Sequence, residues 1–159
     1  MGNFESPKDI SPQHALNQGG LLFERQFPAD ARIVPQARHD ALAICQSSGI
    51  TDDECTSLDL ALGEALANAV RHGGSEGFVC LAVWSYQGNL ILRVHNGGPG
   101  FEPPQPPYPM PAGFPATSGR GLPLMETLTD AMMVCRGDAN EGGSSTFLVK
   151  HLPEAKTAI

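Results

Sequence analysis

The stretch LALGEALANAVRHGG, Leu60 to Gly74, carries three polar residues at four-residue intervals on an alanine-rich helical pattern. At about 100° per residue, Glu64, Asn68 and His72 fall along the shoulder of an apolar stripe, so their side chains can point together into a cleft. The stripe consists of Leu58, Leu62, Ala65, Leu66 and Ala69. Because most surface helices show polar residues at this spacing, the helix alone leaves a solvated face and a functional site both open.

Both ends of this helix are marked in the sequence. Thr51 and Glu54 match a capping box at its start, and the glycines of RHGG supply its stop. Upstream, ADARIVPQARHDALAICQSSGI (29–50) repeats apolar residues at helical spacing, and Pro35 is tolerated near a first turn. Two consecutive helices are therefore predicted.

Strand patterns flank these helices. LLFERQFP (21–28) alternates apolar and polar residues and ends in proline, which is typical of an edge strand. The apolar runs FVCLAVWSY (78–86) and LILRVHN (90–96) are joined by a tight loop that contains glycine, which predicts an antiparallel hairpin. MMVCR (132–136) and STFLVKHL (145–152) predict a closing hairpin around GDANEGG.

A third helix is predicted between the two hairpins, because RGLPLMETLTDAM (120–132) resumes helical spacing. Helices grouped against strands that are joined by hairpins predict an α+β two-layer sandwich. We expect a mostly antiparallel sheet covered on one face by about three helices, in a domain spanning residues 21–153. Residues 1–20 have the composition of a disordered tail, and residues 154–159 form a short C-terminal tail.

Composition excludes several functional classes. The 159-residue chain has a net charge of −7 and no basic cluster that could follow a phosphate backbone, so nucleic acid is not an expected partner. It has no apolar run of about 18 residues and no signal-peptide pattern, which predicts a cytoplasmic protein without a membrane partner. The four scattered cysteines are interpreted as free, mostly buried thiols.

Two glycine clusters follow the polar helix. VHNGGPGF (94–101) leaves a predicted strand, where glycines let the backbone approach a ligand, and SGRGL (118–122) precedes a helix, whose N-terminus favours an anion such as phosphate. Separately, each cluster also fits an ordinary turn or hinge. From the first cluster into the second, GGPGFEPPQPPYPMPAGFPATSG (97–119) is dense in Gly and Pro for over twenty residues, too many for a passive connection. The joint order of polar helix, glycines, long loop and glycines makes coincidence a poor explanation.

Together, EALANAVRHG, VHNGGPGF and SGRGLPLMETLTD resemble the N, G1 and G2 boxes of the GHKL superfamily of gyrases, heat-shock chaperones, histidine kinases and mismatch-repair ATPases. Within it, the GRGL arrangement and the ending STFLVKHL look most like the small stand-alone anti-sigma-factor serine/threonine-protein kinases. The resemblance runs from about Phe23 to Leu152. It implies a Bergerat, or histidine-kinase-like ATPase, fold that binds ATP with Mg²⁺ between the N-box helix and the lid.

The resemblance also implies roles for individual residues. Glu64 matches the catalytic carboxylate that polarises the attacking hydroxyl, and Asn68 matches the amide that binds Mg²⁺; both are chemically suited to these tasks. Arg71 and His72 match the end of the N box, where they either contact phosphate or only complement the helix dipole. The other nucleotide-binding positions that it implies are Asn96, Gly98, Gly100, Gly119, Arg120, Gly121, Leu122 and Thr146. An ordinary core position remains the alternative for Leu122.

Asn96 departs from the family pattern, which has an aspartate that accepts a hydrogen bond from the adenine amino group. The asparagine carbonyl can accept the same bond without the charge, which lowers the expected affinity by on the order of 1 kcal/mol. The amide can also turn and present its donor to a base such as guanine. The lid is the segment EPPQPPYPMPAGFPATS (102–118), and its prolines fit a preformed lid, a partner-binding surface or a tolerated surface loop.

The function implied by the resemblance is an ATP- and Mg²⁺-dependent protein-serine kinase. It would phosphorylate a serine of an anti-sigma-factor antagonist, bind a sigma factor, and form a homodimer. Asn96 and the proline-rich lid favour an alternative, a nucleotide-responsive or nucleotide-independent protein-binding module without kinase activity. A third alternative is the detached ATPase domain of a histidine-kinase system, although no acceptor-histidine segment precedes the domain, and a lone helical histidine such as His39 is usually inert.

Overall fold

The computed structural model describes residues 20–72, 77–97, 127–136 and 143–152. Their helices and strands are, in order, β1 (Gly20–Pro28), α2 (Val34–Ser47), α3 (Asp52–His72), β2 (Phe78–Tyr86), β3 (Asn89–Asn96), β4 (Ala131–Arg136) and β5 (Ser144–His151). The five strands form one sheet in the order β1-β2-β3-β5-β4, and every neighbouring pair is antiparallel.

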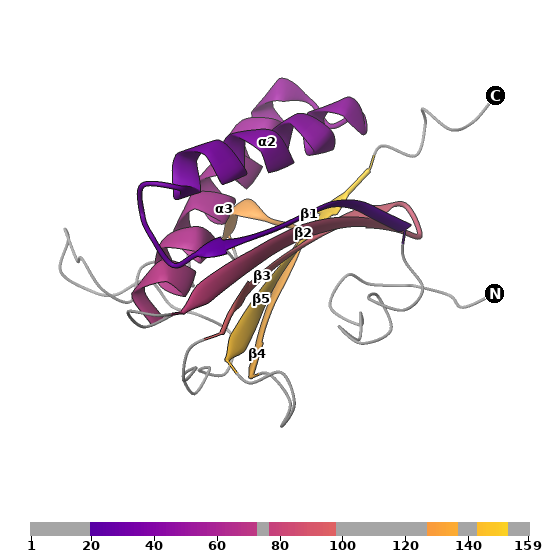
Figure 1. Ribbon diagram of the computed structural model, residues 1–159. Helices are drawn as coiled ribbons and strands as arrows, with labels where there is room; N and C mark the ends of the chain where they lie inside the picture. Colours follow the sequence, from indigo (N-terminus) through magenta and orange to yellow (C-terminus); the bar gives the residue numbers. More distant parts are fainter. Residues whose placement is uncertain (1–19, 73–76, 98–126, 137–142, 153–159) are drawn as a thin grey trace, which may run out of the picture.

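The helices α2 and α3 lie together over one face of this sheet (Figure 1). The predicted α+β architecture, the edge position of β1 and both predicted hairpin pairings are therefore confirmed. Of the predicted third helix, only Thr127 and Leu128 have helical backbone among the described residues, and 120–126 lie outside them. The predicted tails, apart from Gly20, also lie outside the described residues.

The start of α3 is held by the predicted capping box. The backbone N–H of Thr51 donates to Oε1 of Glu54 at 2.8 Å, and the N–H of Glu54 donates to Oγ1 of Thr51 at 3.1 Å. Lys150, near the end of β5, lies 3.4 Å from Oε2 of Glu54. The hydrogen bond from Thr51, helped by the charge of Lys150, holds the pKa of Glu54 below its ordinary value.

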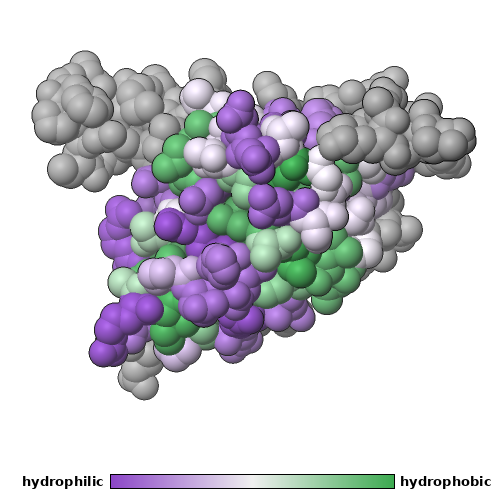
Figure 2. Space-filling view, turned by 90° about the horizontal axis from the view of Figure 1, so that it is seen from above, coloured by the Kyte–Doolittle hydropathy of each residue, from purple (hydrophilic) through white to green (hydrophobic). Residues whose placement is uncertain are grey.

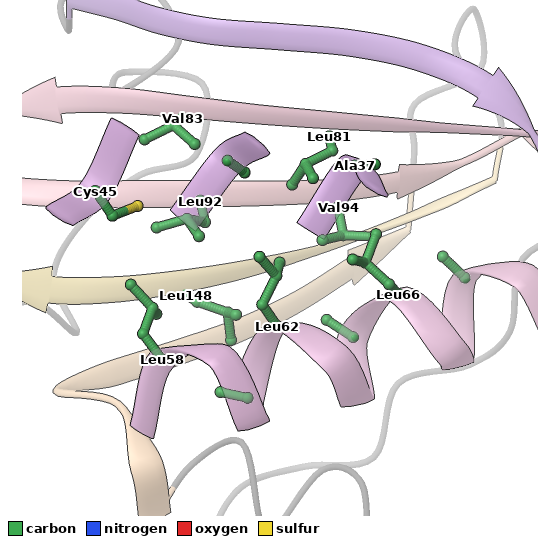
Figure 3. Close-up of a cluster of buried hydrophobic side chains, with 14 of the residues drawn as sticks. Ala37, Cys45, Leu58, Leu62, Leu66, Leu81, Val83, Leu92, Val94 and Leu148 are labelled. Carbon is green, nitrogen blue, oxygen red and sulfur yellow. The ribbon is translucent and has the colours of Figure 1, made fainter. Parts of the chain in front are cut away.

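The apolar stripe of α3 packs on the sheet (Figure 3). Leu58, Leu62 and Leu66 are completely buried, and they point toward side chains of the sheet. The facing residues alternate along the strands, as expected when one face of a sheet is covered; they include Leu81, Val83, Leu92, Val94 and Leu148. Since burying one leucine contributes roughly 1.5–3 kcal/mol, this stripe supplies much of the stability of the fold.

The α2 helix begins at Val34 with Pro35 in its first turn, as predicted, and it buries Ala37, Ala41 and Cys45. Burial raises the pKa of the Cys45 thiol to about 12. All four cysteines are free, but the expectation that most are buried is wrong, because only Cys45 is. The other three are partly exposed: Cys55 lies in the first turn of α3, and Cys80 and Cys135 lie on the face of the sheet away from the helices.

The opposite face of the sheet is also lined with apolar side chains. They form a second buried cluster of Ala82, Trp84, Tyr86, Ile91, Ala131, Phe147 and Val149. Toward the viewer in Figure 2, the outward side of the helix layer is largely hydrophilic. Within the described residues, no helix is long and apolar enough to cross a membrane.

Candidate functional site

The second half of α3 and the strand ends around Asn96 lie at the same end of the molecule (Figure 1). Asn96 ends β3 and pairs with Val79 at the start of β2 and with Ser144 at the start of β5. The ion pair between Glu54 and Lys150 ties the first turn of α3 to the other end of β5. The helix therefore runs toward the end of the sheet where Asn96 lies.

The polar residues of α3 lie at the edge of its buried stripe, as predicted. Glu64, Asn68 and His72 are partly exposed, whereas Arg71 is exposed. The Nη2 of Arg71 donates a hydrogen bond of 2.7 Å to Oδ1 of Asn68. Arg71 and His72 are the basic residues of the last turn, where a cation complements the helix dipole.

Asn96 is buried, with 3% of its surface exposed. Its Nδ2 donates a hydrogen bond of 2.9 Å to Oγ of Ser144, which is also buried. Its Oδ1 is buried as well, and among the described residues no group donates to it. An unsatisfied buried acceptor costs about 1–3 kcal/mol, so this oxygen favours a ligand that brings a donor.

Thr146 is another buried polar residue at this end. It follows Ser144 by two positions on β5, so the two side chains point to the same face of the sheet. Ser145, between them, points to the opposite face, where its Oγ lies 2.8 Å from Nδ1 of His95 and accepts a hydrogen bond of 3.0 Å from Nε of Arg93. The polar residues at the start of β5 therefore make side-chain hydrogen bonds on both faces of the sheet.

Two glycines allow the backbone to pack closely around Asn96. A Cβ at Gly97 would overlap the ring of Phe78, and a Cβ at Gly143 would overlap the carbonyl oxygen of Asn96. Gly143 also has a φ of +66°, in the left-handed region that other residues avoid. Gly143 therefore requires glycine, whereas a side chain at Gly97 would require the ring of Phe78 to shift.

The structure thus places Asn96 and Thr146 at the end of the molecule toward which α3, with Glu64, Asn68, Arg71 and His72 on its second half, runs. The remaining predicted positions lie outside the described residues; they are Gly98, Gly100, Gly119, Arg120, Gly121 and Leu122.

The sequence pattern did not predict a role for Ser144 or Gly143 in this site. The available signal was the triplet GSS (143–145) at the start of an apolar strand, but its meaning depends on the pairing of β5 with β3.

A surface groove of about 380 Å³ lies elsewhere, between α2 and the first half of α3. It is lined by His39, Leu42, Ala43, Gln46, Asp52, Cys55, Thr56 and Asp59. Because these α3 residues belong to the end opposite Asn68 and Arg71, the groove is separate from the candidate site.

Residues 27–150 match the family described as the histidine kinase-like ATPase domain. The chain belongs to this family. Membership confirms the predicted superfamily, and it agrees with the sheet and helix layers described above. ATP is the nucleotide that membership in a family of ATPase domains implies.

Three relatives of this histidine kinase-like ATPase domain cover most of its length. An anti-sigma F factor of Geobacillus kaustophilus (strain HTA426) is 29% identical over 138 residues, covering 82% of this chain and 92% of that protein. The serine-protein kinase RsbW of Bacillus subtilis (strain 168) is 29% identical over 139 residues, covering 81% and 84%. RsbW of Bacillus pumilus (strain SAFR-032) is 30% identical over 156 residues, covering 91% and 96%.

Proposed function

We propose that this protein is an ATP- and Mg²⁺-dependent protein-serine kinase that acts as an anti-sigma factor. It transfers the γ-phosphoryl group of ATP to a serine of an anti-sigma-factor antagonist, and it binds a sigma factor. The names of its relatives, anti-sigma F factor and serine-protein kinase, support the two parts of this proposal. The observation that carries it is the buried Oδ1 of Asn96, an acceptor that has no donor among the described residues.

The adenine base fits this acceptor. Its exocyclic amino group is a donor, and a hydrogen bond to Oδ1 of Asn96 would remove the cost of leaving that oxygen unsatisfied. Thr146, buried on the neighbouring strand, would assist in recognising the base. By resemblance, Gly98 and Gly100 shape the same side of the site.

The phosphates and Mg²⁺ fit the end of α3. Asn68 offers a side-chain oxygen, the ligand type that Mg²⁺ prefers, and water and phosphate oxygens would complete the coordination. Bound Mg²⁺ would neutralise part of the phosphate charge. Arg71 and His72 lie at the same helix end, where they either contact the phosphates or only complement the helix dipole. By resemblance, Gly119, Arg120, Gly121 and Leu122 would hold the phosphates from the lid.

Glu64 is the proposed catalytic base. It lies one turn before Asn68 on the same edge of α3, partly exposed, so its carboxylate can reach the proton of a substrate hydroxyl. The serine oxygen would attack the γ-phosphorus as the bond to the bridging oxygen breaks and ADP leaves. Glu64 would take the serine proton.

The partners and location of the protein follow from the same resemblance. We infer that it acts in the cytoplasm and forms a homodimer, in addition to binding a sigma factor and an antagonist. Light scattering of the purified protein across a concentration range tests the dimer directly.

A phosphoryl-transfer assay with labelled ATP, Mg²⁺ and the cognate antagonist tests the kinase. Glu64→Gln should reduce transfer by about 100-fold or more, with ATP affinity nearly unchanged, because the variant keeps the shape of the side chain and loses the base. Asp53→Asn, a carboxylate change in the first turn of the same helix, is the matched control and should transfer at the wild-type rate. Labelling that survives Glu64→Gln would rule out Glu64 as the base.

A second candidate function is a nucleotide-responsive binding module without kinase activity. The uncharged Asn96 in place of a carboxylate favours it, since a neutral acceptor binds adenine less strongly. Calorimetry with ATP, ADP and GTP in the presence of Mg²⁺ separates the two functions from a pure protein scaffold, which would give no binding heat at millimolar nucleotide. The names of the relatives, anti-sigma F factor and serine-protein kinase, favour these functions over a detached histidine-kinase domain.

A further inference from the structure

We propose that Ser144 is a specificity-determining residue that sets the base preference of the site by fixing the orientation of the Asn96 side-chain amide. Its hydroxyl holds the amino end of that amide, so the carbonyl end faces the nucleotide and selects adenine over guanine. The inference rests on the proposed nucleotide binding and extends it to the choice of base.

The contact between the two side chains is buried and specific. Asn96 and Ser144 are directly paired across β3 and β5, and the hydrogen bond from Nδ2 to Oγ measures 2.9 Å. Only 3% of Asn96 and 2% of Ser144 are exposed, so water does not replace this bond if it is lost. The end of the amide that does not bond to Ser144 must therefore find its hydrogen-bond partner in a ligand.

The two ends of an amide make this position sensitive to its neighbour. An aspartate presents an acceptor whichever way it turns, whereas an asparagine presents an acceptor in one orientation and a donor in the other. Adenine carries an amino group where guanine carries a carbonyl, so the outward end of Asn96 decides which base is accepted. With Nδ2 held by Ser144, Oδ1 is the end left for a ligand.

The backbone fixes Ser144 in place opposite Asn96. Gly143, at positive φ, brings β5 so close to the carbonyl of Asn96 that no Cβ fits. On the other face of the sheet, Ser145 is hydrogen-bonded by Arg93 and in contact with His95. Because neighbouring residues of a strand point to opposite faces, anchoring Ser145 on one face fixes the direction of Ser144 on the other.

The test compares affinities for ATP and GTP with Mg²⁺, measured by calorimetry on the full chain. Wild-type protein should prefer ATP, and Ser144→Ala should reduce the ratio of the two affinities about fivefold or more. A change that only loosens the fold lowers both affinities and leaves their ratio unchanged. Ser85→Ala, the same substitution on β2 at the other end of the sheet from Asn96, is the matched control and should keep the wild-type ratio.

A double variant makes the test sharper. In the Asn96→Asp background the side chain has no donor end, so Ser144→Ala should leave the ratio of affinities unchanged. If Ser144→Ala fails to fold, Ser144→Thr and Ser144→Val can replace it. Threonine and valine have nearly the same shape, but only threonine keeps the hydroxyl. Only the valine variant should therefore lose the preference for ATP.

Each outcome is informative. An unchanged ratio in Ser144→Ala or Ser144→Val, with wild-type protein binding ATP, would overturn the role of Ser144 and leave the proposed function standing. Wild-type protein that binds neither nucleotide would overturn the proposed function and this inference together.

Discussion

Arg71 donates a hydrogen bond of 2.7 Å from Nη2 to Oδ1 of Asn68, across one turn at the end of α3. The accepting oxygen is the same atom that we propose for Mg²⁺. Coordination of the metal and this hydrogen bond therefore compete for one atom. Removing Arg71 should therefore change the Mg²⁺ requirement of ATP binding. The direction of the change distinguishes a side chain that only bonds to Asn68 from one that contacts phosphate.

Arg71→Ala should lower the Mg²⁺ concentration needed for half-maximal ATP binding by about two- to tenfold. The reason is that an intramolecular hydrogen bond worth about 0.5–1.5 kcal/mol no longer has to be broken. A titration of ATP binding against Mg²⁺ measures this shift. Arg38→Ala, which removes an arginine that is ion-paired with Asp59, is the control. A higher Mg²⁺ requirement with weaker ATP binding would instead identify Arg71 as a phosphate contact.

Glu54→Gln should make the protein less stable at neutral pH and have little effect in acid. The hydrogen bond from Thr51 lowers the pKa of Glu54 from its ordinary value of 4.5, so its stabilising contribution is present above that value. The contribution is lost as the pH falls through the lowered pKa of the folded state. After allowance for solvent screening, we expect about 0.3–1 kcal/mol at pH 7.

Urea unfolding at pH 7 and at pH 3 measures this difference. Glutamine keeps the shape and can still accept the hydrogen bond of a capping box, so the comparison isolates the charge. An equal difference between wild type and variant at both pH values would show that the charge of Glu54 contributes nothing to stability.

Leu62→Ala and Leu60→Ala, two positions apart on α3, should have very different effects. Leu62 is completely buried, and its truncation should cost about 2–5 kcal/mol through lost burial and an internal cavity. Leu60 is 54% exposed, so the same truncation should cost less than about 0.5 kcal/mol. Chemical denaturation of both variants tests this assignment of the buried face. Similar losses for the two would contradict the packing in Figure 3.

Local patterns were sufficient to predict most of the described helices and strands. The capping box at Thr51 and Glu54, the apolar stripe of α3 and the glycine turn before β3 each specify structure within a few residues. The exposure of Glu64 and Asn68 also followed from helical spacing alone. These features are local, so a single sequence contains the information that they need.

The contacts of the site depend on longer-range pairing, and they were not predicted. Asn96 meets Ser144 only because β5 pairs with β3 in a particular register, and β5 lies between β3 and β4 in the sheet. A shift of one residue would place Ser145 opposite Asn96 and turn its side chain to the other face. The bond between Arg71 and Asn68 depends on a choice of rotamer that spacing does not determine.

Gly143→Ala and Gly88→Ala separate backbone strain from close packing. Both glycines have positive φ, +66° and +77°, so alanine at either position should cost about 1–2 kcal/mol. At Gly88 a Cβ meets no described atom within 4 Å, whereas at Gly143 it would overlap the carbonyl oxygen of Asn96. Gly143→Ala should therefore be the more destabilising change in urea unfolding. Because it pushes β5 away from Asn96, it should also weaken ATP binding about tenfold, whereas Gly88→Ala should bind ATP like wild type. Equal stability and equal ATP affinity in the two variants would contradict the close approach of β5 to Asn96.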